Sequence, residues 1–291
     1  MTVTILDGGL GQELLARAPE APTKLWAAQV MVDHPQIVRA VHDDYFAAGA
    51  EVATANTYNL HHDRFRGTPL EGKLPDLHAT ALSMARASRD AHGSGRIAGS
   101  LGPIGWSYRA DHAPPAEEAA EIYAELVEFQ DAHVDLFIAE TLSGVDQARG
   151  ALMGMKAATK PRWMAVSVDD ADGRRLRSGE PVADLLPLIE EFAPDAVLIN
   201  CSHPEAIAAA LPTLASLGLP FGAYANAFTK ISAEYTDGAT TVDLLPARKD
   251  MSPTRYADFA ETWAEAGATL IGGCCEIGPA HIAELAKRFH G

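Results

Sequence analysis

The fold is indicated by one short stretch of the chain, Ala196-Val197-Leu198-Ile199-Asn200-Cys201-Ser202-His203-Pro204. Its first four residues form an apolar run, which is typical of a buried β-strand. The proline at its end is typical of the first turn of a helix, and an alanine-rich segment follows up to Leu217. The stretch therefore predicts a strand that turns directly into a helix, with Asn200 and Cys201 at the junction.

The same pattern recurs from one end of the chain to the other. Apolar runs predict strands at Val3–Leu6, Glu51–Thr54, Ile97–Ser100, Leu136–Ala139, Trp163–Val166, Val197–Ile199, Phe221–Ala223 and Thr269–Ile271. Amphipathic or alanine-rich segments predict helices at Gln36–Ala48, Pro75–His92, Ala116–Val134, Val145–Ala157, Val182–Glu191, Pro204–Leu217, Pro253–Ala266 and Pro279–Phe289. Strand–helix alternation indicates a parallel sheet, and eight such units favour an α/β fold of the TIM type, a closed (β/α)₈ barrel, over an open sheet. No linker divides the sequence, so we expect a single domain over residues 1–291.

Composition and charge argue against several classes of partner. The chain has 291 residues and a formal net charge of −16, and this negative field repels nucleic acid and anionic membranes. No apolar run approaches the roughly 20 residues that span a bilayer, and the first residues lack the basic start of a signal peptide. Three cysteines, two of them adjacent, make no disulfide framework, so we expect a cytoplasmic protein. The sequence is compatible with a homo-oligomer but does not indicate one.

Two long connections stand out between the predicted elements. Residues His61–Leu74 follow the second strand, and residues Ala227–Ser252 follow the seventh. Loops longer than about 15 residues in a compact domain are often lids or binding loops. A tolerated surface insertion is an equally good interpretation of each.

All three cysteines lie where predicted strands end. Cys201 follows the sixth strand, and Cys274 and Cys275 follow the eighth, in the motif Gly272-Gly273-Cys274-Cys275-Glu276. The active site of a (β/α)₈ barrel lies at the carboxyl ends of its strands, so we expect these thiols to converge there. A lone cysteine usually behaves as a small buried hydrophobe, but three at one rim favour a metal site. A vicinal disulfide between Cys274 and Cys275 is the other interpretation.

Zn²⁺ is the metal that this set of ligands favours. Thiolates are soft ligands, which prefer Zn²⁺ to Mg²⁺ or Mn²⁺. Three protein ligands leave one position of tetrahedral Zn²⁺ open, as in catalytic sites. Such a negatively charged site is a poor Lewis acid for carbonyl groups, but it can hold a substrate thiol as the thiolate. We therefore expect Cys201, Cys274 and Cys275 to serve a reaction in which sulfur attacks an activated methyl group.

Other polar and aromatic groups are expected at the same rim. Asp7 ends the first strand beside Gly8, where the backbone can approach a ligand closely, and Glu140 ends the fourth. Either carboxylate could bind a substrate ammonium group; the alternatives are a helix N-cap for Asp7 and a solvated loop for Glu140. Trp106 follows the third strand, and an aromatic face attracts a cation by about 0.5–2 kcal/mol, although packing is the commoner role. His203 is a weaker candidate ligand, because it is expected to begin the next helix.

Taken together, these residues resemble the homocysteine S-methyltransferase family. Its members include S-methylmethionine- and betaine-dependent enzymes and the homocysteine-binding module of cobalamin-dependent methionine synthase. The most specific motifs are Asn200-Cys201 and Gly272-Gly273-Cys274-Cys275, in that order. The resemblance covers essentially the whole chain and includes Leu6-Asp7-Gly8-Gly9-Leu10-Gly11-Gln12-Glu13-Leu14, Ala55-Asn56-Thr57-Tyr58-Asn59, Gly99-Ser100-Leu101-Gly102-Pro103 and Glu140-Thr141.

The resemblance implies a (β/α)₈ barrel in which Cys201, Cys274 and Cys275 bind Zn²⁺. It also implies that homocysteine is the thiol substrate, with Asp7 and Glu140 near its amino group, and that methionine is the product. The implied methyl donor is a small methylated cation such as S-methylmethionine or betaine.

Three asparagines are further candidates for binding the amino acid. We hypothesise that Asn56, Asn200 and Asn226 help to orient it. The chain departs from the family pattern nearby, with Tyr224-Ala225-Asn226 where many members have Tyr-Pro-Asn, and Glu276-Ile277-Gly278 where many have threonine or Arg-Thr. These departures leave the donor undefined.

Three functions are compatible with the sequence. The first is zinc-dependent methyl transfer to homocysteine by direct displacement. The second is a zinc hydrolase or lyase on the same barrel, which would activate water instead of a thiol. The third is a thiol redox sensor that uses Cys274 and Cys275. Three thiolates favour the first, because zinc sites that activate water more often contain histidine.

Overall fold

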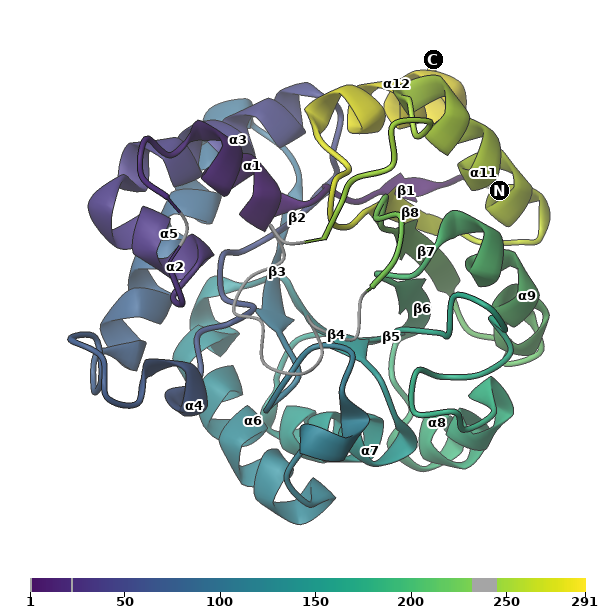
Figure 1. Cartoon of the computed structure of the whole chain (residues 1–291), viewed down its shortest axis with the longest axis horizontal. Helices are drawn as coiled ribbons and strands as arrows, with labels where there is room; N and C mark the ends of the chain where they lie inside the picture. Colours follow the sequence, from purple (N-terminus) through teal and green to yellow (C-terminus); the bar gives the residue numbers. More distant parts are fainter. Residues whose placement is uncertain (1, 22, 232–244) are drawn as a thin grey trace.

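Eight parallel strands form a barrel in the computed structural model, which describes residues 2–21, 23–231 and 245–291 (Figure 1). The strands are β1 Thr4–Ile5, β2 Val52–Thr54, β3 Arg96–Leu101, β4 Leu136–Leu142, β5 Arg162–Val166, β6 Ala196–Asn200, β7 Phe221–Ala225 and β8 Leu270–Gly273. Each overlaps a strand predicted from the sequence. Buried parallel strands are continuous apolar runs, which explains why the sequence pattern located them.

The strands follow one another around the barrel in the order β1-β8-β7-β6-β5-β4-β3-β2. The gap between β1 and β2 is narrowed by a parallel bridge between Leu6 and Val52 and by backbone hydrogen bonds on both sides of it. The barrel is therefore nearly closed. The prediction of a (β/α)₈ barrel is confirmed, and the alternative of an open doubly wound sheet is wrong.

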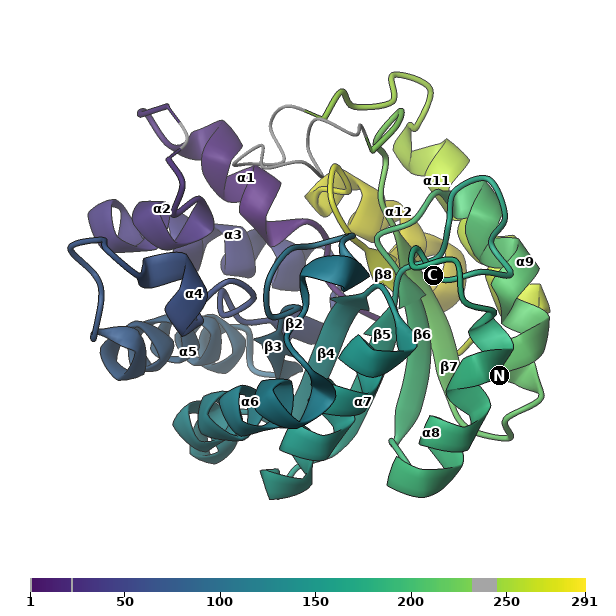
Figure 2. The ribbon, with the colours of Figure 1, turned by 60° about the horizontal axis from the view of Figure 1, so that its bottom comes forward.

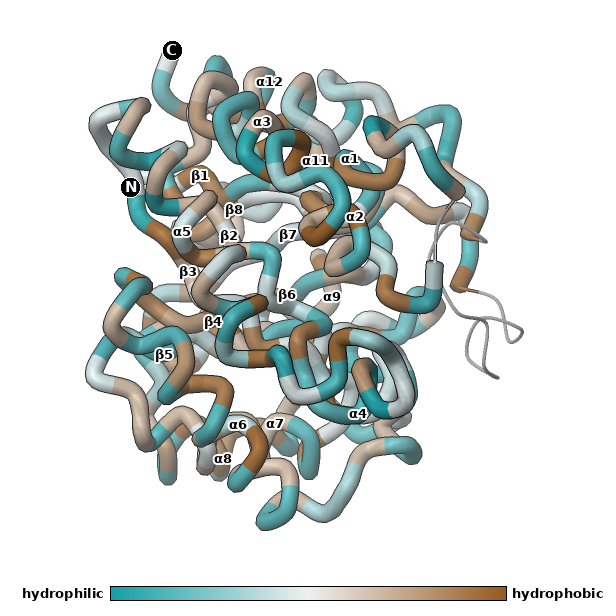
Figure 3. The backbone as a smooth tube through the Cα atoms, turned by 90° about the vertical axis from the view of Figure 1, so that its left-hand side faces the viewer, coloured by the Kyte–Doolittle hydropathy of each residue, from teal (hydrophilic) through white to brown (hydrophobic). Residues whose placement is uncertain are grey.

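Helices surround the barrel on its outer side, as Figures 1 and 2 show. They are α1 Leu10–Arg17, α2 Ala27–Asp33, α3 Pro35–Ala47, α4 His62–Phe65, α5 Leu74–His92, α6 Ala116–Gln130, α7 Val145–Gly154, α8 Leu186–Phe192, α9 Pro204–Ala215, α11 Pro253–Glu265 and α12 Pro279–His290. Hydrophilic and hydrophobic residues alternate along these helices in Figure 3, as expected when one face packs on the sheet.

The helix predictions need three kinds of correction. Helices α1, α2 and α4 were not expected, and α4 lies inside the connection predicted as the loop His61–Leu74. The predicted helices 116–134 and 145–157 end earlier, at Gln130 and Gly154, and continue as short 3₁₀ turns. The segment predicted to begin a helix at Val182 begins with a 3₁₀ turn instead. The terminal backbone groups of an α-helix lack α-helical partners and often form 3₁₀ hydrogen bonds instead, which residue pattern alone does not reveal.

Successive side chains of a strand point to opposite faces of the sheet, and this alternation directs the site residues into the barrel. Leu136 and Ile138 of β4 belong to the apolar cluster inside the barrel, and Glu140 follows them on the same face of the strand. Glu140 therefore lies above the apolar interior, at the carboxyl end of the barrel. Among the described residues, no helix is long and apolar enough to cross a membrane. Of the long connection Ala227–Ser252, residues 232–244 lie outside the described ranges.

Candidate metal and substrate site

The three cysteines converge at the carboxyl end of the barrel. Their sulfur atoms lie within 4.8 Å of one another, and the Cys201 and Cys275 sulfurs are 3.8 Å apart. A tetrahedral ion with metal–sulfur bonds of about 2.3 Å separates its sulfur ligands by roughly 3.8 Å. The Cys201–Cys275 separation therefore matches tetrahedral coordination, and the third sulfur lies within 4.8 Å of both. His203 does not join it; its Nε2 atom lies 3.8 Å from an Asp170 carboxylate oxygen.

Strand β7 holds the two cysteine motifs in register, since it lies between β6 and β8. The Cys201 amide donates to the Tyr224 carbonyl over 3.0 Å, and the Cys274 amide donates to the Ala225 carbonyl over 2.8 Å. Cys201 has a φ of 47°, in the left-handed region. For a residue with a side chain this conformation costs about 1–3 kcal/mol and is common at functional sites. It turns the chain sharply at the end of β6, where the thiol joins the cluster.

Glycines after β1 bring the first strand against the paired cysteines. A Cβ atom on Gly9 would lie 2.6 Å from the Cys274 carbonyl oxygen, and one on Gly8 would lie 2.0 Å from the Ile277 carbonyl oxygen. Only glycine permits such close backbone contact. The turn therefore places Asp7 beside the cysteine cluster.

A tyrosine and an arginine support the first cysteine. The Tyr108 hydroxyl lies 2.9 Å from the Cys201 sulfur, and the Arg177 guanidinium stacks over the Tyr108 ring at 4.8 Å. Arg177 is fixed in turn by two hydrogen bonds of 3.0 Å to Asp170. Burial raises the pKa of the Cys201 thiol, but hydrogen bonds from the other two cysteines and Tyr108 outweigh it and hold that pKa well below its usual value. The environment therefore favours a thiolate at Cys201.

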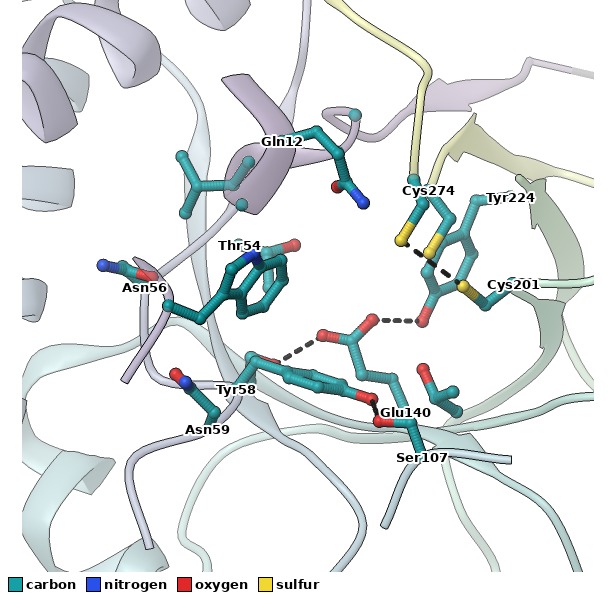
Figure 4. A pocket seen from close by; sticks show the side chains of 18 of the residues that line it. Gln12, Thr54, Asn56, Tyr58, Asn59, Ser107, Glu140, Cys201, Tyr224 and Cys274 are labelled. Carbon is teal, nitrogen blue, oxygen red and sulfur yellow. Dashed lines mark hydrogen bonds between the residues drawn. The ribbon is translucent and has the colours of Figure 1, made fainter. Parts of the chain in front are cut away.

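Two buried carboxyl groups, those of Asp7 and Glu140, share the cleft with the cysteines. Figure 4 shows Glu140 next to Tyr224, on the side of the cleft where Cys201 and Cys274 lie. Asp7 accepts hydrogen bonds from the Thr54 amide at 2.7 Å and the Thr54 hydroxyl at 3.0 Å. Glu140 accepts one from the Ser100 hydroxyl and one of 3.0 Å from the Tyr224 hydroxyl. Burial raises the pKa of Asp7 to about 8 and that of Glu140 to about 7. A cationic group between them would stabilise both carboxylates, so the pair suits a substrate ammonium group.

The remaining predicted site residues divide into two groups. Gly8, Asn56 and Trp106 line the cleft. Asn200 does not; its side chain is fully buried and exchanges two hydrogen bonds with Thr141, which does line the cleft. Asn226 is also buried behind the wall, where its amide donates to the Cys201 sulfur over 3.9 Å. Direct contact of these two asparagines with a substrate therefore has no support in the geometry.

Comparison with known proteins defines the family of this barrel. The family model described as homocysteine S-methyltransferase matches residues 4–289. The chain belongs to the homocysteine S-methyltransferase family. It is 32% identical to the homocysteine S-methyltransferase of Escherichia coli (strain K12), over 98% of this chain and 95% of that protein. It is 29% identical to homocysteine S-methyltransferase YbgG of Bacillus subtilis (strain 168), over 97% and 93%.

A solved structure of the same family supports the fold and a metal site. The metallated form of the homocysteine methyltransferase MmuM from Escherichia coli superimposes with a TM-score of 0.81 and 30% identity, covering 99% of this chain and 96% of that one. The predicted resemblance to homocysteine S-methyltransferases is thus confirmed, and with it the prediction of a methyltransferase. A hydrolase, a lyase or a redox sensor finds no such support.

Several cleft residues of this family member were not predicted from its sequence. Trp26, Arg64 and Thr54 line the cleft beside the expected groups. Trp26 precedes α2 and Arg64 lies in α4, two helices that the sequence pattern did not reveal. The sequence places Thr54 at a strand end but indicates no role for it. Its hydrogen bonds to Asp7 depend on the approach of β1 and β2, which only the closed barrel brings about.

Proposed function

We propose that the protein transfers a methyl group from a small methylated cation to the thiol of homocysteine, which forms methionine. The observation that carries this proposal is the cluster of three cysteine sulfurs next to a buried pair of carboxyl groups. A thiol-bearing amino acid matches both features, because its sulfur suits the cysteine cluster and its ammonium group suits Asp7 and Glu140. The names of the curated relatives agree with this acceptor.

We propose Zn²⁺ as the bound metal, with Cys201, Cys274 and Cys275 as its ligands. Three thiolates prefer zinc to harder ions, and the spacing of the sulfurs fits tetrahedral coordination. The ion would supply one property, a lower pKa for the substrate thiol. The existence of a metallated form of the homocysteine methyltransferase MmuM from Escherichia coli supports a bound metal.

Side chains of the protein would hold the two substrates in position for methyl transfer. Asp7 and Glu140 would hold the ammonium group of homocysteine, which fixes the sulfur at the cysteine end of the cleft. The electron pair of the thiolate sulfur forms the new bond to the methyl carbon, while the bond from that carbon to the donor's cationic sulfur or nitrogen breaks. The leaving atom keeps the electron pair and becomes neutral, and the thiol proton passes to solvent. Holding both partners in line is the main contribution that the protein can make.

The donor is proposed as a sulfonium or quaternary ammonium compound. Trp26 and Tyr58 line the cleft, and aromatic rings attract methylated cations. We further propose that the protein acts in the cytoplasm. Its cysteines are free, and reduced thiols are normal in that compartment.

The test is metal content together with zinc-edge X-ray absorption. Protein purified under reducing conditions is expected to hold about one zinc per chain with three sulfur ligands, rising to four when homocysteine is added. Cys201→Ala is expected to lose both metal and activity. His203→Gln is the matched control, since it changes a neighbouring residue outside the cluster. A zinc shell that ignores homocysteine, or a fully active Cys201→Ala variant, would contradict the proposal.

A further inference from the structure

Two residues of the cleft wall have a strained backbone. Thr141 in β4 has a φ of 62°, and Cys201, directly after β6, has a φ of 47°. Such a conformation costs about 1–3 kcal/mol and is rare for a β-branched residue such as threonine. At the same place the pairing of β4 with β5 shifts register, between Ala139 and Leu142. Because Thr141 follows Glu140, these two strained positions fix where the Glu140 carboxyl group and the Cys201 sulfur lie.

The side chain of Asn200 joins the two strained positions. Its Oδ1 atom accepts from the Thr141 amide over 2.9 Å, and its Nδ2 atom donates to the Thr141 hydroxyl over 3.0 Å. Strand β5 lies between β4 and β6 in the sheet, so these hydrogen bonds reach across a whole strand. The Ser167 hydroxyl, just past β5, holds Asn200 from below by donating to its carbonyl over 3.0 Å. All three side chains are buried, so water cannot replace these bonds.

Tyr224 of β7 makes a second connection between the same two groups. Its hydroxyl donates to Glu140 over 3.0 Å, which Figure 4 shows, and its carbonyl accepts from the Cys201 amide over 3.0 Å. Glu140 and Cys201 are therefore joined by two separate sets of contacts, one through Asn200 and Thr141 and one through Tyr224. The distance between the carboxyl group and the cysteine cluster is fixed by buried hydrogen bonds.

A fixed distance matters for a ligand that binds at both of its ends. Once one end is bound, the other meets its partner at an effective concentration that depends on how well the protein holds the two partners apart. Homocysteine is such a ligand in the proposed function, with its ammonium group at Glu140 and its sulfur at the cysteine cluster. If these two groups of the protein moved independently, most of the gain from binding both ends would be lost.

We propose that Asn200 is a positioning residue, which acts through Thr141 to fix the distance between the Glu140 carboxyl group and the cysteine cluster. This inference rests on the proposed function and deepens it. Asn200 does not need to touch the substrate for this role. It favours acceptors that carry an ammonium group and a thiol on one chain over molecules that carry only one of the two.

The test is calorimetric binding of three ligands to zinc-loaded, reduced protein. The ligands are homocysteine, 2-aminobutanoate, which lacks only the thiol, and 4-mercaptobutanoate, which lacks only the amino group. Wild-type protein is expected to bind homocysteine at least about tenfold more tightly than either of the others. In Asn200→Leu the affinity for homocysteine is expected to fall about tenfold, while the affinities for the other two ligands change less than about threefold.

Variants of Thr141 test the same bonds where Asn200→Leu does not fold. Thr141→Val removes one of the two hydrogen bonds and is expected to lose part of the affinity for homocysteine, whereas Thr141→Ser keeps the hydroxyl and is expected to match wild-type protein. The double variant Asn200→Leu/Thr141→Val is expected to bind homocysteine no more weakly than Asn200→Leu, because both changes remove the same contact. Additive losses would overturn the inference.

Gln147→Leu is the matched control for Asn200→Leu. Gln147 carries an equally buried amide, which accepts from the Ser143 backbone over 2.7 Å on the same connection after β4. It belongs to α7 and is not among the described residues that line the cleft. Its replacement is expected to lower stability but to leave the relative affinities for the three ligands unchanged. A control that lost homocysteine binding selectively would overturn the role of Asn200.

The remaining outcomes separate the inference from the proposed function. If Asn200→Leu weakens 4-mercaptobutanoate or 2-aminobutanoate as much as homocysteine, Asn200 supports only one end of the site and the inference fails. It also fails if the advantage of homocysteine survives in Asn200→Leu. Wild-type protein that binds homocysteine no more tightly than 2-aminobutanoate would overturn the proposed function and the inference together. If the advantage is present, is lost in Asn200→Leu and yet no methyl group is transferred, the inference stands and the proposed function fails.

Discussion

At the scale of single residues, the buried carboxyl groups link substrate binding to stability. Burial raises the pKa of Glu140 to about 7, so the folded protein holds this proton at a pH where the unfolded chain has released it. Stability from Glu140 is therefore greatest in acid and falls as pH rises from its ordinary pKa through 7. Binding of an ammonium group has the opposite dependence, because it requires the ionised carboxylate.

We predict that methionine, the thiol-free product, binds more tightly as pH rises from 6 to 8.5. Isothermal titration across this range measures the effect without interference from a substrate thiol. Glu140→Gln is expected to weaken binding at least tenfold and to flatten its pH dependence, leaving the contribution of Asp7. The same variant is expected to raise the free energy of unfolding at pH 8 by about 1–2 kcal/mol. The exposed Glu117→Gln serves as control. A pH-independent affinity in wild-type protein would contradict the prediction.

The hydroxyl of Tyr108 is a second residue with a separable role. It lies 2.9 Å from the Cys201 sulfur, and groups that hydrogen-bond to metal ligands tune their donor strength. Tyr108→Phe is expected to keep the fold and the ring contact with Arg177 but to weaken metal retention about tenfold in competition with a chelator. The control is Tyr123→Phe, which removes a buried hydroxyl that bonds Gly102 instead of a cysteine. Equal metal retention in the two variants would show that the Tyr108 hydroxyl does not act on the metal site.

At the scale of elements, helix α3 carries a histidine that makes the fold sensitive to acid. His42 is fully buried against the barrel side of the helix, and neither ring nitrogen has a partner among the described residues. Burial lowers the pKa of His42 to about 4. The neutral ring is stable in the fold above the ordinary pKa of histidine, and this stability is lost as pH falls from 6.5 toward 4.

Replacing His42 should therefore remove part of this sensitivity. Between pH 7 and pH 5, His42→Leu is expected to lose about 1–2 kcal/mol less unfolding free energy than wild-type protein. Urea denaturation at the two pH values measures the difference. His62→Leu is the control, since 52% of the His62 side chain is exposed. If the pH slope of His42→Leu matches that of His62→Leu, burial of His42 is not the cause.

The elements also show what the sequence could and could not predict. The strands and their site residues were found because a buried parallel strand is a continuous apolar run, and polar residues at its end stand out. Cys201 and Glu140 are of this kind. Helices α2 and α4 are short, and the start of α2 is held by tertiary hydrogen bonds from Asn56 to the Ala27 carbonyl and from Asn59 to the Leu25 carbonyl. Pattern alone cannot show such contacts, so Trp26 and Arg64 were missed.

Sequence pattern also cannot show which strand-end residues face the cleft and which are buried behind its wall. Asn200 and Asn226 lie at strand ends like Cys201, so sequence position could not separate them from true cleft residues. The difference is one of direction, since Asn200 turns toward Thr141 and is fully buried there. In the structure Asn200 bonds Thr141 of the cleft wall, and Asn226 contacts the Cys201 sulfur; their predicted role in orienting the amino acid stays a prediction.

At the scale of the whole molecule, the barrel closes through side chains as well as backbone. Strands β1 and β2 share a single bridge, and carboxylates complete the seam between them. At the carboxyl end Asp7 bonds Thr54, and at the other end Glu51 accepts the Ile5 amide over 2.8 Å. His290, near the end of α12, lies 2.8 Å from the Val3 carbonyl oxygen and ties the last helix to the first strand. Since Asp7 follows β1 by two residues, closure of the seam also positions this carboxyl group in the cleft.

We predict that the contact between β1 and β2 depends on the hydrogen-bond acceptor that the Glu51 side chain provides. Glu51→Ala leaves the buried Ile5 amide without an acceptor and is expected to lower the free energy of unfolding by about 1–2 kcal/mol. Glu51→Gln keeps a carbonyl oxygen within reach of that amide and is expected to stay within about 0.5 kcal/mol of wild-type protein. Urea denaturation of the three proteins at one pH makes the comparison. The Glu51 charge is absent from both variants, and the His290 ring lies 3.7 Å from that carboxylate. Equal losses of unfolding free energy in the two variants would therefore assign the effect to the ion pair with His290. A loss confined to Glu51→Ala would show that the hydrogen bond across the seam closes the barrel.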